Sequence, residues 1–100
     1  MHIAIGSWNF PFCGATWKVA PALAAGNTMI FKPSPLAPIT TTILAEILYD
    51  AGAPPGTLNI VQGDAETGTI LCQNSDIAKV SFTGGIQTGT KVGCIAILII

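Results

Sequence analysis

Two stretches of this sequence combine residue types and spacing that suit the binding of an anion. The run Gly84-Gly85-Ile86-Gln87-Thr88-Gly89 follows a strand-like segment, and glycines at a strand-to-helix turn let the backbone approach a ligand closely. Unpaired N–H groups at a helix start favour a phosphate, although an ordinary turn is the alternative. Lys32 ends another strand-like segment, where it could bond ribose hydroxyls or a phosphate or remain a solvated lysine.

Asn9 suggests a second kind of chemistry. It stands between Trp8 and Phe10 and two residues before Pro11. A side-chain amide held in one orientation can donate a hydrogen bond to an oxyanion that develops during a reaction. Asparagine also caps helices and orders turns, and the spacing leaves both interpretations open.

The cysteines and the histidine form no catalytic or metal-binding pattern. Cys13, Cys72 and Cys94 are widely spaced and include no Cys-x-x-Cys pair, so neither a disulfide framework nor a zinc site is indicated. None has a neighbouring base that would activate it as a nucleophile, and His2 has no companion ligand. We expect no metal site, and a reducing, cytoplasmic setting fits the cysteine usage best.

The scaffold that positions these residues is predicted to be α/β. Strand-like segments begin near Thr28, Thr57 and Ala78, with helix-like segments between them. This spacing suits a βαβαβ unit with right-handed crossovers and therefore a parallel sheet with flanking helices. An earlier apolar run, Ile3 to Ile5, ends at Gly6.

The helices are predicted from apolar spacing and capping residues. The first is expected over Gly14 to Ala25, kinked or interrupted at Pro21 because proline lacks the backbone N–H. A second begins at Ile39, a third follows a cap at Asp64, and a fourth starts after Ile86.

The last seven residues, Cys94 to Ile100, break this alternation. They are uncharged and mostly β-branched or aliphatic, which is the composition of an aggregation-prone segment. Nothing polar marks a helix face here, so a buried strand is one interpretation. The stretch is too short to span a bilayer, which needs about 20 apolar residues.

The composition bounds the possible partners. Charged residues make up 9% of the 100 residues, against about 25% in typical soluble domains. We infer that much of the surface is meant to be covered by other protein. A net charge of −1 without a basic cluster gives no support to nucleic-acid binding, and no apolar stretch is long enough for a membrane span.

Several segments together resemble the aldehyde dehydrogenase superfamily. The segments that carry the resemblance are Trp8-Asn9-Phe10-Pro11, Gly26 to Ser34, Ala51-Gly52 with Pro55 to Val61, and Phe82-Thr83-Gly84. They run in the expected order from about Ile3 to Val92. Phe31 to Pro35 and Val80 to Gly84 are most similar to the betaine-aldehyde and trimethylaminobutyraldehyde branch. The resemblance implies an incomplete, Rossmann-like NAD-binding domain.

The resemblance also implies roles for individual residues. Asn9 would donate to the oxyanion of a thiohemiacetal, and Trp17 would line the aldehyde tunnel. The residues implied at the cofactor are Trp8, Lys32, Ser34, Pro35, Gly84, Gly85, Ile86, Gln87 and Thr88. The implied reaction is oxidation of a small-molecule aldehyde to a carboxylic acid with NAD, or NADP, in a homo-oligomeric enzyme.

The sequence departs from the family pattern at several positions. Gly85 replaces a serine, and Pro35 replaces a glutamate that clamps the ribose diol in many members, which leaves the choice between NAD and NADP open. Ser7 replaces a proline or alanine. Residues 1–92 therefore resemble a fragment of the cofactor-binding domain, and residues 93–100 form an unrelated apolar tail that lacks the family's catalytic glutamate and cysteine.

Three hypotheses follow for the function. The chain is part of an aldehyde dehydrogenase that performs the chemistry only in a full-length protein, and alone it has no turnover because the nucleophilic cysteine is missing. Alternatively, it is a non-catalytic form that binds nucleotide or full-length subunits through exposed apolar surface. In the third hypothesis its core is too incomplete to fold alone.

Overall fold

A parallel β-sheet forms the centre of the molecule. The computed structural model describes residues 1–97, which form four strands and four helices in alternation. The strands are β1 (His2–Ile5), β2 (Met29–Lys32), β3 (Leu58–Ile60) and β4 (Lys79–Phe82), in the order β3-β2-β1-β4. Every pairing is parallel, with Ile3 opposite both Ile30 and Val80. The predicted α/β class with a parallel sheet is confirmed.

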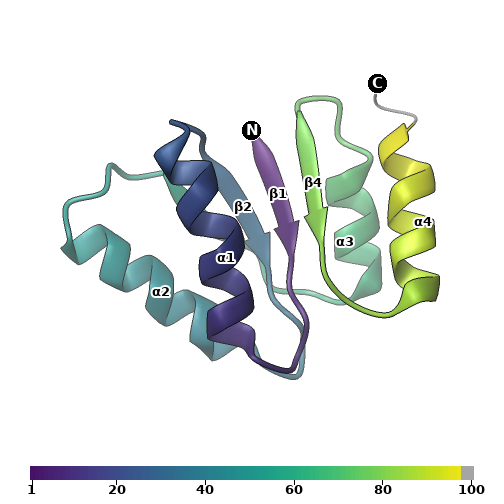
Figure 1. Ribbon diagram of the computed structural model, residues 1–100, viewed down its shortest axis with the longest axis horizontal. Helices are drawn as coiled ribbons and strands as arrows, with labels where there is room; N and C mark the ends of the chain where they lie inside the picture. The colour runs from purple at the N-terminus through teal and green to yellow at the C-terminus, as the bar shows by residue number, and fades with distance from the viewer. Residues whose placement is uncertain (98–100) are drawn as a thin grey trace.

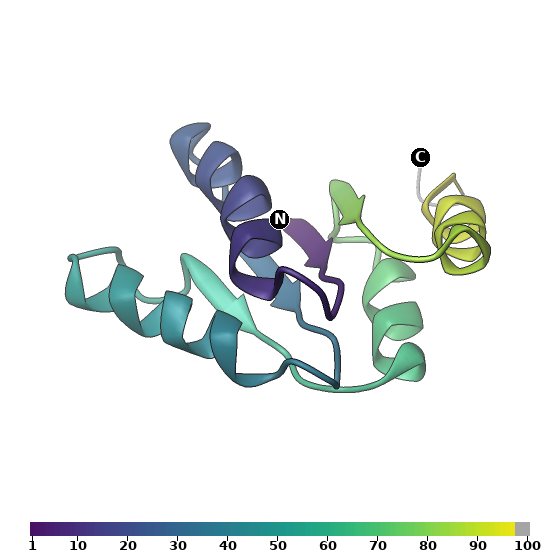
Figure 2. The ribbon, with the colours of Figure 1, turned by 60° about the horizontal axis from the view of Figure 1, so that its bottom comes forward.

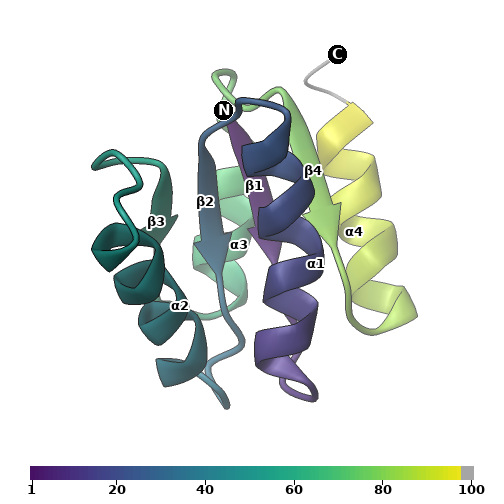
Figure 3. The same cartoon turned by 60° about the vertical axis from the view of Figure 1, so that its left-hand side comes forward.

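The helices cover both faces of this sheet. They are α1 (Pro11–Ala24), α2 (Ile39–Asp50), α3 (Ala65–Cys72) and α4 (Ile86–Ile97). Helices α1 and α2 lie side by side on one face, and α3 lies on the opposite face (Figures 1 and 3). Helix α4 packs against α3 and β4 at the far edge, as the view in Figure 2 also shows.

The core lies between β1, β2 and α1. Helix α1 buries Ala15, Val19 and Ala22, which are spaced by four and then three residues and therefore share one helix face. They pack against the strand residues Ala4 and Phe31. The short apolar run predicted at Ile3 to Ile5 is thus the central strand of the sheet.

Helix α1 differs from its predicted form at Pro21. The helix starts at Pro11 rather than Gly14, and it continues through Pro21 to Ala24. The predicted interruption is wrong, because proline removes only its own N–H donor while Val19 and Ala22 on either side are held in the core. Gly26, with a φ of 75°, closes the helix as expected.

The end of the chain also differs from the expectation. Cys94 to Ile97 form the last turn of α4 and not a strand, and α4 runs across the predicted boundary after Val92 without a break. Residues 98–100 lie outside the described part of the chain. Within residues 1–97, no helix is both long and apolar enough to cross a membrane.

Candidate functional site

A cleft of about 770 Å³ lies at the carboxyl ends of β1, β2 and β4. This volume is within the range of about 300–1,000 Å³ that is typical of small-molecule sites. The chain crosses from β1 towards β2 and β3, and later returns to place β4 on the other side of β1. Parallel α/β sheets bind ligands at such a change of direction, beyond the carboxyl ends of the strands.

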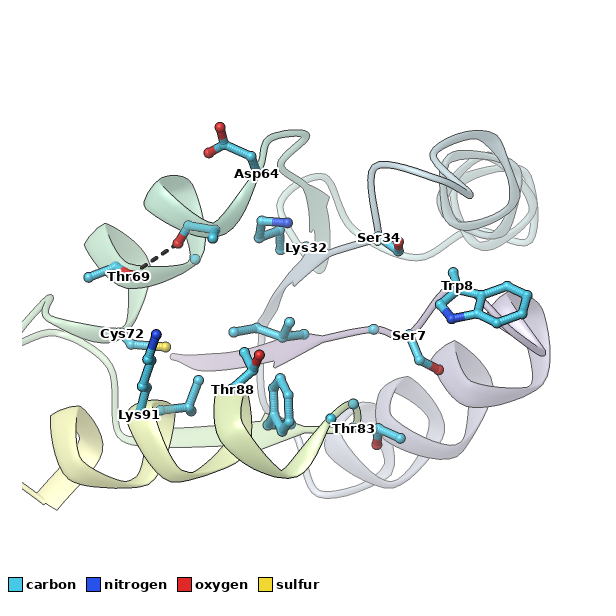
Figure 4. A pocket seen from close by; sticks show the side chains of 18 of the residues that line it. Ser7, Trp8, Lys32, Ser34, Asp64, Thr69, Cys72, Thr83, Thr88 and Lys91 are labelled. Atoms are coloured by element: carbon cyan, nitrogen blue, oxygen red, sulfur yellow. Dashed lines mark hydrogen bonds between the residues drawn. The ribbon is translucent and has the colours of Figure 1, made fainter.

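Most of the residues singled out from the sequence meet in this cleft. Those that line it are Trp8, Asn9, Lys32, Ser34, Pro35, Gly84, Gly85 and Thr88. Figure 4 shows Trp8 and Ser34 toward one end of the cleft, with Thr88 on α4 near its middle. Ile86 and Gln87 do not line the cleft. Trp17 borders a separate cavity of about 240 Å³ on the amino-terminal half of the sheet.

Lys32 is a buried cation in the cleft wall. The side chain is only 4% exposed, and its Nζ donates a hydrogen bond to the carbonyl of Pro33 at 3.2 Å. Burial lowers the pKa of Lys32, while the nearby carboxylate of Asp64 acts in the opposite direction. The alternative of a solvated lysine is therefore wrong. An ammonium group has three donors, and the Pro33 carbonyl occupies one of them.

The loop that carries Asn9 is held in an unusual conformation. Phe10 has φ 50° and ψ 49°, the left-handed region that costs a bulky residue about 1–2 kcal/mol. The Ser7 hydroxyl donates to the Asn9 carbonyl at 3.2 Å, and Gly14 N donates to the Phe10 carbonyl at 2.9 Å. Strained backbone of this kind persists where the surrounding structure fixes it, often at functional sites.

Asn9 does not cap α1. The N-cap position belongs to Phe10, and no side chain makes a capping hydrogen bond there. Of the two interpretations of Asn9, the capping one is therefore wrong. Asn9 is instead an exposed residue among those that line the cleft.

The glycine turn lies between β4 and the first turn of α4. The carbonyl of Gly85 accepts a hydrogen bond from Gly89 N at 2.9 Å, which starts the helix. A Cβ on Gly85 would meet nothing within 4 Å. The first backbone N–H groups of α4 have no partner earlier in the helix, and the open space at Gly85 lets a ligand approach them.

Four further residues line the cleft that the sequence did not assign to it. They are Asp64 at the N-cap of α3, Thr69 and Cys72 on α3, and Lys91 on α4 (Figure 4). Cys72 is fully buried, and burial raises the pKa of its thiol, so it acts as a small core residue. The sequence predicted Asp64 as a helix cap, and the structure confirms that role. No sequence pattern indicated that α3 lies beside the cleft.

The donor set of this site suits an organic anion better than a metal. Within residues 1–97, no three His, Cys, Asp or Glu side chains come together in a way that could hold a metal ion. The wall instead offers the ammonium groups of Lys32 and Lys91, hydroxyl groups, and an open glycine turn. Such donors match phosphate and ribose groups.

A twisted parallel sheet with helices on both faces and a cleft at its carboxyl edge defines a Rossmann-like α/β domain. The family described as the aldehyde dehydrogenase family matches this sequence over residues 1–97. The chain belongs to the aldehyde dehydrogenase family.

Individual relatives agree with this assignment. The chain is 59% identical over 90 residues to the 4-trimethylaminobutyraldehyde dehydrogenase of Homo sapiens, a match that covers 90% of this chain and 18% of the relative. The betaine aldehyde dehydrogenase of Staphylococcus aureus, solved in complex with NAD+, superposes with a TM-score of 0.94 at 37% identity, covering 98% of this chain and 20% of that one. The HpcC protein of Thermus thermophilus gives a TM-score of 0.93 at 42% identity, covering 97% and 19%. The chain thus spans about a fifth of the length of these proteins.

Proposed function

We propose that this chain supplies part of the cofactor site and the oxyanion-stabilising amide of an enzyme that oxidises an aldehyde to a carboxylic acid. The observation that carries the proposal is the buried ammonium of Lys32 in a cleft at the carboxyl edge of the sheet. Burying a cation is costly unless a partner compensates it. A ribose diol or a phosphate is a partner of suitable chemistry.

The cofactor of this proposal is NAD, with NADP as the alternative. Lys32 with Ser34 and Pro35 would hold the adenosine ribose, and Trp8 would border the cleft. The backbone of Gly84 and Gly85, together with Thr88, would face the pyrophosphate at the start of α4, whereas Ile86 and Gln87 lie outside the cleft lining. The volume, the open glycine turn and the two lysines fit such a dinucleotide. When bound, the cofactor supplies the acceptor for hydride.

The contribution of Asn9 to the chemistry is electrostatic. In the proposed reaction a thiolate attacks the aldehyde carbonyl, and negative charge develops on the carbonyl oxygen. Removing one preorganised amide donor from such an oxyanion typically costs about 10²–10³ in rate. The strained Phe10 and the Ser7 hydroxyl bond give the loop the fixed geometry that this role needs. The nucleophile and the water-activating group would come from polypeptide beyond these 100 residues.

The substrate is proposed to be an aldehyde that carries a trimethylammonium group. The support is the 59% identity with 4-trimethylaminobutyraldehyde dehydrogenase. Trp17, 76% exposed on α1, is the candidate lining residue of the aldehyde tunnel. A tryptophan face attracts quaternary ammonium groups, so this residue suits such a substrate.

A second candidate is a non-catalytic form that associates with other subunits of the family. It is favoured by large apolar side chains that remain exposed within residues 1–97, including Phe10 at 79%, Leu36 at 80% and Ile86 at 89%. Contiguous exposed apolar surface marks interaction sites. Co-migration of the chain with a full-length family member on size exclusion, without turnover of its own, would support this candidate.

The test of cofactor binding is calorimetric titration of the purified chain with NAD. We expect saturable binding that Lys32→Met abolishes, because methionine keeps the stem but removes the ammonium. Lys79→Met is the matched control, since Lys79 is exposed at the amino end of β4. Circular dichroism must show that each variant is folded. The proposed role of Lys32 would be contradicted if both variants still bound NAD, or if the folded chain itself did not bind NAD.

A further inference from the structure

Asp64 is a carboxylate in the cleft wall to which the proposed function gives no role. It caps α3, where its Oδ1 accepts a hydrogen bond from Glu66 N at 3.1 Å. The cap restrains the side chain at the first turn of the helix. Because Asp64 also lines the cleft, a negative charge is fixed at this wall.

The stem of Lys32 runs along the same side of α3. A Cβ on Gly68 would lie 3.6 Å from Cδ of Lys32, so the lysine stem packs on this glycine. Gly68 N bonds to the Asp64 carbonyl at 3.3 Å, one helical turn earlier. Asp64 therefore lies on the side of the cleft where the lysine stem runs, as Figure 4 shows. The two groups are close enough for the carboxylate of Asp64 to raise the pKa of Lys32 against the effect of burial.

We propose that Asp64 makes the cleft select a nucleotide with free ribose hydroxyls at Lys32 over one with a phosphate monoester there, that is, NAD over NADP. The inference rests on the proposed function, because it assumes that the ribose binds at Lys32.

The physical basis is the sign of the charges. A ribose hydroxyl can donate a charge-assisted hydrogen bond to a carboxylate. A phosphate monoester carries a charge of about −1.5 to −2 at neutral pH, and the carboxylate repels it. Asp64 also offsets the attraction that Lys32 alone would exert on that phosphate. Lys91 is exposed on the opposite wall, where it acts on both cofactors through their shared pyrophosphate.

The experiment compares NAD and NADP binding to the chain and to two charge variants by calorimetry. Asp64→Asn removes the charge but keeps the cap, because asparagine is an equally good N-cap residue. Glu66→Gln removes one negative charge two residues away, at an exposed site that does not line the cleft. We expect the unsubstituted chain to prefer NAD, and Asp64→Asn to reduce that preference by about tenfold through tighter NADP binding. Glu66→Gln should leave the preference unchanged.

The outcomes separate this inference from the function it rests on. If NAD binds but Asp64→Asn leaves the NAD-to-NADP ratio as it was, the role of Asp64 is refuted and the cofactor site stands. If Asp64→Asn and Glu66→Gln change the NAD-to-NADP ratio equally, the change comes from the overall charge and not from the position of Asp64, and the role is refuted as well. No NAD binding by the folded chain, with Lys32→Met giving the same result, would overturn both proposals.

Discussion

The ring of Phe82 lies directly against the backbone of Gly84, so that a Cβ on Gly84 would come within 2.6 Å of ring Cζ. The ring also approaches Gly89, where a Cβ would be 3.2 Å from Cε1. Phe82 and both sides of the turn therefore form one packed unit beneath the cleft. Gly84 has no room for a side chain because a Cβ would overlap the Phe82 ring, whereas Gly85 faces open volume.

This difference predicts opposite outcomes for two neighbouring substitutions. Gly84→Ala must displace the Phe82 ring, which we expect to cost about 1–3 kcal/mol of stability, as overpacking does, and to weaken NAD binding. Gly85→Ala should leave stability within about 0.5 kcal/mol, the range of ordinary surface substitutions. Urea denaturation and NAD titration of both variants measure the difference. Equal stability of the two would mean that Phe82 moves without cost and that the packed unit has no structural role.

The sequence allowed the layout of the sheet and helices to be predicted because local signals agreed with the fold. The cap at Asp64 and the helix stop at Gly26 both lie where the sequence predicted them. The start of α1 was missed by three residues because the left-handed Phe10 has no sequence signature, although Pro11 suits the first helical position. The interruption predicted at Pro21 is absent because the packing of α1 outweighs one lost hydrogen bond.

The site was only partly predictable for a different reason. Lys32 and the glycine turn were recognised from their position after strands, but burial of Lys32 depends on Gly68, which is 36 residues away in the sequence. Asp64 likewise reaches the cleft only because the chain crosses back from β3 to β4. Local patterns do not encode such long-range proximity, and the resemblance to a family supplied roles without supplying these contacts.

Lys18 predicts a pH dependence of stability. Its Nζ donates to the carbonyls of Ile5 and Ser81 at 3.1 and 3.2 Å, which ties α1 to β1 and β4. Burial lowers the pKa of Lys18 from 10.5 to about 8. Between these values the unfolded chain binds more protons than the folded chain, so the free energy of unfolding should rise as pH increases from about 8 to about 10.5. Below this window both states are protonated and the gain is absent.

The measurement is the difference in unfolding free energy between the chain and Lys18→Met across that window. The comparison is needed because burial raises the pKa of Cys72, which lowers stability as pH rises and is common to both proteins. We expect the free energy of unfolding of the unsubstituted chain to rise relative to that of Lys18→Met as the pH increases. Lys79→Met, at an exposed position, should follow the unsubstituted chain. A pH-independent difference would show that Lys18 has the same proton affinity in both states.

Thr41 predicts a stabilising substitution in α2. Its side chain is 1% exposed, and within the described residues its Oγ1 has no hydrogen-bond partner. A buried hydroxyl without a partner costs about 1–3 kcal/mol. Thr41→Val keeps the branched shape and removes the hydroxyl, so we expect the free energy of unfolding to rise by about 1 kcal/mol, at the lower end of that range.

The neighbouring Thr42 provides the control for this prediction. Its hydroxyl is exposed and donates to the Pro38 carbonyl at 3.3 Å, so Thr42→Val should lower stability slightly or leave it unchanged. Urea denaturation followed by circular dichroism measures both variants, and a cooperative transition would also contradict the hypothesis that the chain cannot fold alone. If Thr41→Val were destabilising, its hydroxyl would have to make a hydrogen bond in the folded chain, and α2 would pack differently around it.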